Sequence, residues 1–424
     1  MLRPRNLTKE ILTQLEKHEI IFLLGTRQTG KTTLTKLVAD CAEYEAGSIF
    51  FFDLEDKEYR SLFEIVSIQL LKNIFKLEGV NFDKPALLIF DEIQLLDDPA
   101  NLFKLLHDHF PQLRIIATGS SSLSIKHKFS DSLSGRKRVF HVEPLSFDEF
   151  LVFKEEDQLV KIRSFFNEEE RESVIPLVKS HHGHFLNLFE EYLIYGGYPE
   201  VVLTDEKTAK IEKLDSIATS YIQKDIREFG RIDNIDGYNN LLKYISVNLG
   251  AQFNLTSAQS TIGLSGQTVK KYISLLQETF IIKELPPYFV NKNKEISKTK
   301  KIFFKDNGIR NLQIKNFHSL DIRTDIGALY ENYVFNVLEQ EKDILTENYF
   351  YRTQAKTEID FIVCHEQNVK LIEVKAGAFN RPIKAMKEFE KKYIKNANKI
   401  KKIVVNKSHV DEINDFVYLP AYLL

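Results

Sequence analysis

Residues 25–32 read Gly25-Thr26-Arg27-Gln28-Thr29-Gly30-Lys31-Thr32, and this stretch decides the fold of the first third of the chain. An apolar run of strand length, residues 20–24, precedes it, and a helix-forming run begins at Thr33. The glycines let backbone N–H groups turn toward a polyphosphate, and the N-terminus of the helix adds partial positive charge. At this spacing Lys31 reaches the β- and γ-phosphates, and the Thr32 hydroxyl binds Mg²⁺. The sequence therefore predicts an ATP-binding loop formed by residues 25–33.

Length and composition restrict the class of protein. A chain of 424 residues is too long for one compact core, so we expect two to four domains. The formal net charge is −2, so any basic surface must be local, and the two cysteines lie too far apart to form a disulfide framework. No apolar stretch is long enough to span a membrane, and the N-terminus does not resemble a signal peptide. We expect a cytoplasmic protein without membrane contact.

Two carboxylates follow an apolar run at residues 86–90. Ligands of parallel α/β sheets bind at the carboxyl ends of the strands, which is where Asp91 and Glu92 would lie. Asp91 is predicted to bind Mg²⁺ directly or through water, and Glu92 to polarise the attacking water. The alternative is an acidic loop after a buried strand.

Later strands supply two more candidates for the same site. The run at residues 113–118 leads into Ser120. Either Thr118 or Ser120 is predicted to sense the γ-phosphate, and the alternative is that the serines from Ser120 onward cap the next helix. Arg136 precedes the last strand, residues 138–142, and is the candidate arginine for stabilising the transition state, in cis or from a neighbouring subunit. It could equally be a surface residue. Strands alternating with helices predict an α/β fold with a doubly wound parallel sheet.

These motifs, in this order, resemble those of AAA-type ATPases of bacteria and archaea that carry an uncharacterised C-terminal half. The resemblance extends over nearly the whole chain. It implies an ATPase core over residues 1–145 and, because such proteins often form rings, a homo-oligomer. The matching segments are residues 25–33, 52–54, 91–94, 118–120, 133–136, 144–150 and 195–199.

The middle of the chain reads as a helical lid or linker (residues 146–232) followed by a winged helix (residues 233–322). Helices are predicted over residues 238–249, 257–262 and 267–279, with Ser265 capping the third. The third helix would offer Gln267, Thr268, Lys270 and Lys271 to a DNA major groove.

A lysine-rich wing is predicted over residues 288–306. Its local excess of four positive charges suits contact with nucleic-acid phosphates. Such contacts give affinity but do not read the base sequence. The alternative is a module for packing or protein contact. The wing lysines are Lys292, Lys294, Lys298, Lys300, Lys301 and Lys305.

The last part, residues 323–424, carries a second set of charged residues. Two strand-like runs flank a loop at residues 365–368, and a symmetric loop would place Asp360 opposite Glu373. Glu358 would then face Lys375, because strand side chains alternate with period two. Opposed carboxylates repel unless a cation lies between them, so we predict Mg²⁺ or Mn²⁺ bound by Asp360 and Glu373.

This arrangement predicts phosphodiester chemistry. The metal would activate a water, Lys375 would stabilise charge on the phosphate, and Glu331, in a helical run, would complete the metal site. The pattern resembles the PD-(D/E)XK nuclease superfamily and implies an α/β restriction-endonuclease-like domain. The alternative is a hairpin with a surface charge network. Beyond it, Lys384, Lys387, Lys391 and Lys395 recur at helical spacing and form a basic face or an ordinary solvated one.

Together these features predict an ATPase whose nucleotide cycle controls a winged-helix and nuclease-like half acting on nucleic acid, most simply DNA. The first alternative is a regulatory ATP switch that binds a protein partner and has an inactive nuclease-like site. The second is a DNA-binding ATPase without nuclease activity.

Overall fold

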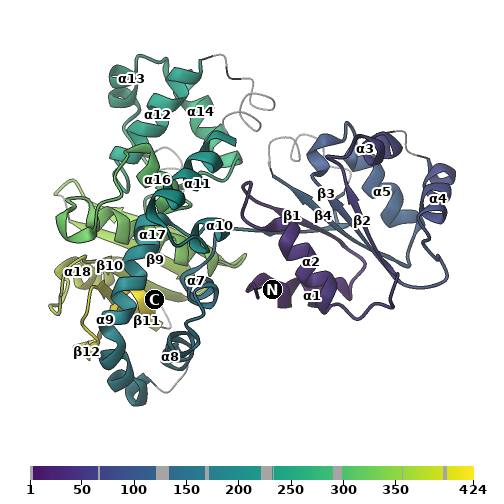
Figure 1. Ribbon diagram of the computed structural model, residues 1–424. Coiled ribbons are helices and arrows are strands. Elements are labelled where there is room, and N and C mark those ends of the chain that lie inside the picture. The colour runs from purple at the N-terminus through teal and green to yellow at the C-terminus, as the bar shows by residue number, and fades with distance from the viewer. Residues whose placement is uncertain are drawn as a thin grey trace.

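The computed structural model describes residues 3–64, 67–120, 133–167, 171–220, 232, 234–289, 298–355, 357–394 and 399–424. Figure 1 shows two parts lying side by side. The N-terminal part is an α/β body, and the larger second part contains the remaining helices and the C-terminal sheet.

The N-terminal part is built on the predicted parallel sheet. Its five strands lie in the order β2-β3-β4-β1-β5 and all run parallel. Every residue of β1 is buried, as expected for a strand covered on both faces. The strands are β1 (Ile20–Leu24), β2 (Ile49–Asp53), β3 (Ala86–Asp91), β4 (Leu113–Gly119) and β5 (Lys137–His141).

Helices cover this sheet and create two hydrophobic clusters. Neighbouring residues of β1 alternate between them: Phe22 packs with Phe90 and Phe103, and Ile21 packs with Leu34. The helices are α1 (Leu7–Leu15), α2 (Lys31–Cys41), α3 (Lys57–Glu64), α4 (Ile68–Leu77) and α5 (Pro99–His109), with the short η1 (Ile93–Leu95).

Helices occupy most of the middle of the chain, as predicted. The first group is α7 (Phe147–Phe153), α8 (Asp157–Asn167), α9 (Arg171–Tyr195), α10 (Pro199–Val202) and α11 (Lys207–Ser220). The second group is α12 (Ile235–Val247), α13 (Leu255–Ile262) and α14 (Gly266–Glu278), followed by the antiparallel strands β6 (Ile282–Leu285) and β7 (Lys301–Phe304). Ser265 caps α14 by accepting the Thr268 N–H at 3.2 Å. Three helices followed by a hairpin is the predicted element order, but β6 lies before the wing that was predicted over residues 288–306.

The C-terminal sheet has six strands in the order β12-β13-β11-β10-β9-β8. Strands β10, β11 and β13 run parallel, and the other pairings are antiparallel. The elements are α16 (Asn307–Gln313), η3 (Leu320–Ile322), α17 (Ile326–Gln340), β8 (Thr346–Arg352), β9 (Glu358–His365), β10 (Asn368–Val374), α18 (Lys384–Tyr393), β11 (Lys399–Asn406), β12 (Asp411–Ile413), β13 (Phe416–Pro420) and η4 (Ala421–Leu423).

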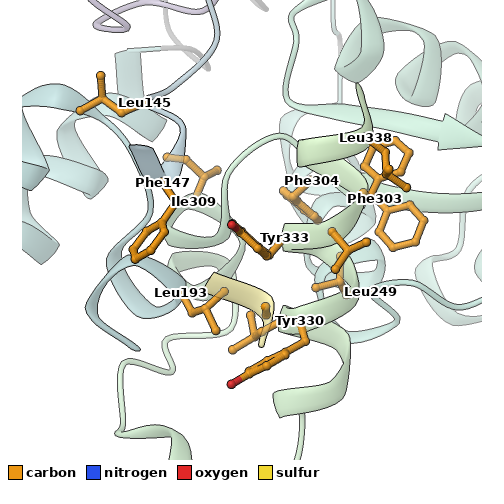
Figure 2. Packing of buried hydrophobic residues seen from close by; sticks show 14 of the residues in the cluster. Leu145, Phe147, Leu193, Leu249, Phe303, Phe304, Ile309, Tyr330, Tyr333 and Leu338 are labelled. Atoms are coloured by element: carbon orange, nitrogen blue, oxygen red, sulfur yellow. The ribbon is translucent and has the colours of Figure 1, made fainter. Parts of the chain in front are cut away.

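One large hydrophobic cluster contains residues from all three units that the sequence suggested between residues 145 and 424, and a smaller separate cluster lies between α18 and the C-terminal sheet. Figure 2 shows Phe147 and Leu193 of the helical segment on one side of Tyr333 of α17, with Phe304 and Phe303 of β7 on the other side. Phe303 stacks on Phe335 with ring centroids 4.4 Å apart. The helical segment (α7 to α11), the three-helix segment (α12 to α14) and the C-terminal sheet therefore pack as one body.

The connection between α9 and α10, residues 196–199, packs closely against the start of α16. We call this contact the junction. The carboxylate of Asp306 accepts the Gly197 N–H at 2.7 Å and caps α16 by accepting the Ile309 N–H at 2.9 Å. A Cβ on Gly308 would lie 2.2 Å from the Tyr195 carbonyl oxygen, so the backbones touch here. The end of β7 and the start of α10 are thus held against each other.

We predict that Gly308→Ala lowers the free energy of unfolding by about 1–3 kcal/mol, because the new methyl group overpacks the junction. Gly327→Ala is the matched control, since a Cβ there meets nothing within 4 Å. It should leave stability unchanged or raise it by up to about 1 kcal/mol through helix propensity. Urea denaturation of both variants measures the difference, and equal stabilities would contradict the close approach.

Stability should also depend on the protonation of Asp306. Burial raises the pKa of Asp306 to about 6, although backbone N–H groups oppose this. The native state therefore binds a proton more tightly than the unfolded chain. This contribution to stability is complete below about pH 4 and is lost as the pH rises through 6, by about 3 kcal/mol. Unfolding free energies measured from pH 4 to 8 should lose this component in Asp306→Asn; identical profiles would refute it.

Candidate functional site

The phosphate-binding loop lies between β1 and α2, as predicted. Gly30 has φ +87°, a left-handed conformation that suits glycine, and Lys31 begins α2 directly after it. A Cβ on Gly25 would lie 2.2 Å from the Val142 carbonyl oxygen. The Lys31 ammonium donates to the carbonyl oxygens of Gly25 and Thr26 at 2.9 and 2.8 Å. Lys31 is therefore anchored within the loop.

The residues predicted to bind Mg²⁺ in this loop region are adjacent. The Thr32 hydroxyl donates to Asp91 Oδ2 at 2.6 Å, and the Thr118 hydroxyl donates to the other oxygen of the same carboxylate. A hydroxyl and a carboxylate oxygen at one place are ligands that Mg²⁺ takes beside a nucleotide. Thr32 and Asp91 would hold the ion.

Glu92 is connected to Ser120 through a residue whose role the sequence did not reveal. Gln94 is 2% exposed, and its amide donates to the Glu92 carboxylate and to Ser120 Oγ, the latter at 3.0 Å. The Ser120 N–H donates back to Gln94 Oε1 at 3.3 Å. Gln94 thus orients both groups. The signal that could have identified it was a polar residue two positions after a pair of acidic residues at a strand end.

A cavity of about 540 Å³ opens beside the loop. It joins the N-terminal part to the helical segment, because Pro199, Glu200 and Ser220 contribute to its wall. Of the predicted residues, Gly25, Thr26, Thr29 and Ser120 lie outside the wall as supports. The lining residues are Arg27, Gln28, Gly30, Lys31, Thr32, Thr33, Asp53, Glu55, Asp91, Glu92, Pro199, Glu200 and Ser220.

Two further residues attach the loop to the helical segment, and the sequence did not reveal either. Thr26 Oγ1 lies 3.2 Å from the Tyr198 hydroxyl. The buried Arg5 guanidinium donates to the Thr29 carbonyl at 2.8 Å and to Glu149 Oε1 of α7 at 2.9 Å. The contacts to the helical segment join residues more than a hundred positions apart, so local patterns carry no trace of them.

The prediction that Arg136 acts on the γ-phosphate in cis is wrong. Arg136 precedes β5, whereas the loop follows the carboxyl end of the parallel strand β1, so the two lie at opposite ends of the sheet. Arg136 binds Asp108 at 2.8 and 3.2 Å, and this hydrogen bonding lowers the pKa of Asp108 to about 2. A role toward a neighbouring subunit stays a prediction.

We predict that Glu92→Gln lowers kcat for ATP hydrolysis by about 10²–10⁴-fold, because it removes the base that polarises water. Nucleotide binding should persist in this variant. Arg136→Ala should retain the monomer's turnover, since its guanidinium faces Asp108. Steady-state phosphate release and fluorescent-nucleotide titration measure both, and loss of turnover in Arg136→Ala would indicate action across a subunit interface.

The second candidate site lies where β9 and β10 meet α17. The β9–β10 ladder is symmetric and ends at Phe361–Ile372, one position before Asp360 and Glu373. The β8–β9 register shifts between Tyr349 and Tyr351, so β9 carries an extra residue near Asp360. Such bulges re-aim side chains. Asp360 Oδ2 accepts the Val374 N–H at 2.8 Å.

Charge pairing in this site differs from the sequence prediction in one respect. Lys375 binds Glu373 Oε1 at 2.7 Å, whereas Glu358 was expected to face Lys375. The partners of Glu358 are Lys301 at 2.8 Å and Arg352 at 3.5 Å. The bulge near the start of β9 breaks the simple alternation on which that prediction rested.

Burial and mutual repulsion shift the acidity of this cluster. Burial, with the charge of Asp360, raises the pKa of Glu331 to about 8 and that of Glu373 to about 7. Burial also raises the pKa of Asp360, which is 8% exposed. Groups that repel when ionised attract a cation.

The fit of a divalent metal to this cluster is partial. Among the described residues, no three His, Cys, Asp or Glu side chains are placed to hold one ion together. Glu331 is paired with Lys301, at 3.7 Å, and does not complete the site as predicted. Mg²⁺ also binds through only two carboxylates plus waters and substrate phosphates, and Asp360 with Glu373 suits that mode.

The basic surface expected on the wing is mostly neutralised within the described residues, so that expectation needs correction. Lys300 binds Glu284 at 2.7 Å, Lys301 binds Glu358, and Lys305 binds Glu143 at 2.9 Å. Lys292, Lys294 and Lys395 lie outside the described residues. On α18, Lys384, Lys387 and Lys391 are exposed, as are Gln267, Lys270 and Lys271 on α14, where Thr268 is half-buried.

Three family models match successive parts of the chain. Residues 17–151 match an AAA domain, residues 186–320 match a domain of unknown function (DUF8612), and residues 326–424 match another domain of unknown function (DUF4143). The AAA match and the loop geometry support an AAA-type ATPase domain that uses a nucleotide and Mg²⁺. In the described part of the chain, no helix is both long and apolar enough to cross a membrane.

Relatives of similar length exist in archaea and bacteria. An uncharacterised protein of Methanocaldococcus jannaschii is 27% identical over 402 residues, covering 91% of this chain and 83% of that protein. An uncharacterised protein of Haemophilus influenzae is 23% identical, covering 100% of this chain and 99% of that protein.

Solved structures show weaker similarity. A Walker-type ATPase of Pyrococcus abyssi has a TM-score of 0.44 and 16% identity over 74% of this chain and 96% of its own. The ORC2 protein of Aeropyrum pernix in its ADP form has a TM-score of 0.33 and 13% identity over 73% of this chain and 90% of its own.

Proposed function

We propose that the protein hydrolyses ATP to control a C-terminal half that cleaves nucleic acid with the help of a divalent metal. The N-terminal cavity would bind the nucleotide, with Lys31 on the phosphates and Glu92 on the attacking water. Asp360, Glu373 and Lys375 would form the second site. Bound metal would supply Lewis acidity and an activated water, and Lys375 would stabilise charge on the phosphate.

One observation carries the proposal: hydrogen bonds between residues that neighbour one another along the backbone lead from the phosphate-binding loop, through residues 196–199, to α17. The loop residue Thr26 contacts Tyr198, and the neighbouring Gly197 N–H donates to Asp306. Next to Asp306, the Asn307 side-chain oxygen accepts from the Asn332 amide at 2.9 Å. Asn332 adjoins Glu331 on α17.

These contacts supply a route for nucleotide-dependent movement. Pro199 and Glu200 line the nucleotide cavity, so a bound nucleotide contacts the segment that contains Gly197. A shift of this segment would act on Asp306 and α16, which pack against α17. Because cores are closely packed, such a shift moves whole elements rather than single side chains.

Nucleic acid as the substrate is supported by the exposed lysines of α18. Lys384, Lys387 and Lys391 recur at helical spacing and are exposed. The Lys384 ion pair with Glu388, at 3.6 Å, is a weak surface pair and does not neutralise the face. Such a face suits contact with phosphates without base readout.

A second function is favoured by one specific observation. Lys301 forms ion pairs with Glu331 and Glu358, two of the four carboxylates of the second site. No three metal-ligating side chains come together among the described residues. This suits an ATP-dependent switch whose C-terminal half binds a protein partner without cleaving nucleic acid.

A cleavage assay on plasmid and oligonucleotide DNA and RNA, with Mg²⁺ or Mn²⁺ and with or without ATP, tests the proposal. We predict cleavage by the wild type, loss of at least about 10²-fold in Asp360→Ala, and loss of ATP dependence in Lys31→Ala. Glu412→Ala, which removes an exposed carboxylate on β12, is the matched control and should cleave normally.

Absence of cleavage on every substrate, with ATP hydrolysis intact, would exclude the nuclease and favour the protein-binding switch. Cleavage that persists equally in Asp360→Ala would point to a contaminant or to another site.

A further inference from the structure

Lys301, the first residue of β7, is a buried cation that comes from outside the C-terminal sheet. It is 3% exposed, and its ammonium lies 2.8 Å from Glu358 Oε1 and 3.7 Å from Glu331 Oε2. The ring centre of Phe350 lies 5.4 Å away on β8. Burial lowers the pKa of Lys301, but the carboxylates of Glu331, Asp360 and Glu358 outweigh this and raise it. The lysine is therefore charged.

The contacts of Lys301 divide the four carboxylates of the cluster into two pairs. Glu331 and Glu358 share its ammonium. Asp360 and Glu373 have no ion pair with it, although the charge of Asp360 also raises the pKa of Lys301. Glu373 Oε1 pairs with Lys375 at 2.7 Å, whereas Glu373 Oε2 is buried without a hydrogen-bond partner among the described residues. A buried carboxylate oxygen without a donor is costly unless a cation meets it. Asp360 and Glu373 are therefore the two carboxylates that can accept a further ligand.

We propose that Lys301 is a positioning residue that restricts the carboxylate cluster to a single divalent metal ion, held by Asp360 and Glu373. The inference rests on the proposed metal-dependent function of this cluster. A second ion would need Glu331 and Glu358 as ligands, where it would meet the ammonium of Lys301 at close range in a poorly hydrated site. Like charges that close repel strongly at low dielectric.

The same contact joins the hairpin to the cluster. Lys301 is followed by Phe303, whose ring stacks on Phe335 of α17, and by Phe304, whose N–H donates to Asn332 at 2.8 Å. The backbone that carries Lys301 is therefore held in place by packing of β7 against α17.

Isothermal titration with Mn²⁺ tests the proposal through stoichiometry. All proteins carry Asp91→Asn, so that the phosphate-binding loop contributes no ion. We expect one Mn²⁺ per chain in this background and none after Asp360→Asn. Lys301→Met should raise the count to two, because Glu331 and Glu358 are released. Lys301→Arg, which keeps the cation, and Lys300→Met, which removes the neighbouring lysine paired with Glu284, should both stay at one.

An unchanged stoichiometry and affinity in folded Lys301→Met would overturn the proposal, as would two ions or none in the starting background. If Lys301→Met unfolds without metal, millimolar Mn²⁺ should restore its thermal transition, because an ion would replace the ammonium; a chain that stays unfolded contradicts this. These outcomes do not depend on cleavage. A protein with the expected ion counts that cuts no nucleic acid would refute the proposed function and leave the role of Lys301 intact.

Discussion

The carboxylate of Asp306 is the constraint on which the arrangement of both candidate sites depends. One oxygen accepts the N–H of Gly197, and the other caps α16 at Ile309. Gly197 leads into the segment that borders the nucleotide cavity, and Asp306 lies shortly after β7, which carries Lys301. The group is buried and both of its oxygens accept hydrogen bonds. A movement of Gly197 therefore requires a matching movement of α16, because otherwise a buried hydrogen bond would be lost.

The two sites are organised by different physical means. In the phosphate-binding loop the site is formed mainly by the backbone. The left-handed conformation of Gly30, the carbonyl contacts to Lys31 and the N-terminus of α2 together create a site for phosphate. In the C-terminal cluster, burial brings carboxylates together against their repulsion, and the fixed ammonium of Lys301 relieves part of it. The first site needs the correct local sequence, whereas the second needs elements that are far apart in the chain.

Sequence reasoning located β1, β3, β4 and β5 to within a residue or two. The first three of these strands are buried apolar runs with clear ends. The same reasoning counted Lys301 among phosphate-binding lysines, and it aimed Arg136 at the nucleotide. Both errors have one cause: the charge of a side chain is visible in the sequence, but the burial and the partner that decide its role are not.

The sequence by itself determined the phosphate-binding loop, the acidic strand end at Asp91 and Glu92, and the pairing order of β9 and β10, because each depends on residues close together in the chain. Tertiary structure alone decided that Gln94 joins Glu92 to Ser120, that Tyr198 and Arg5 attach the loop to the helical segment, and that Lys301 pairs with Glu331 and Glu358. These contacts join residues brought together by packing of the core, and long-range packing leaves no periodic pattern in a single sequence.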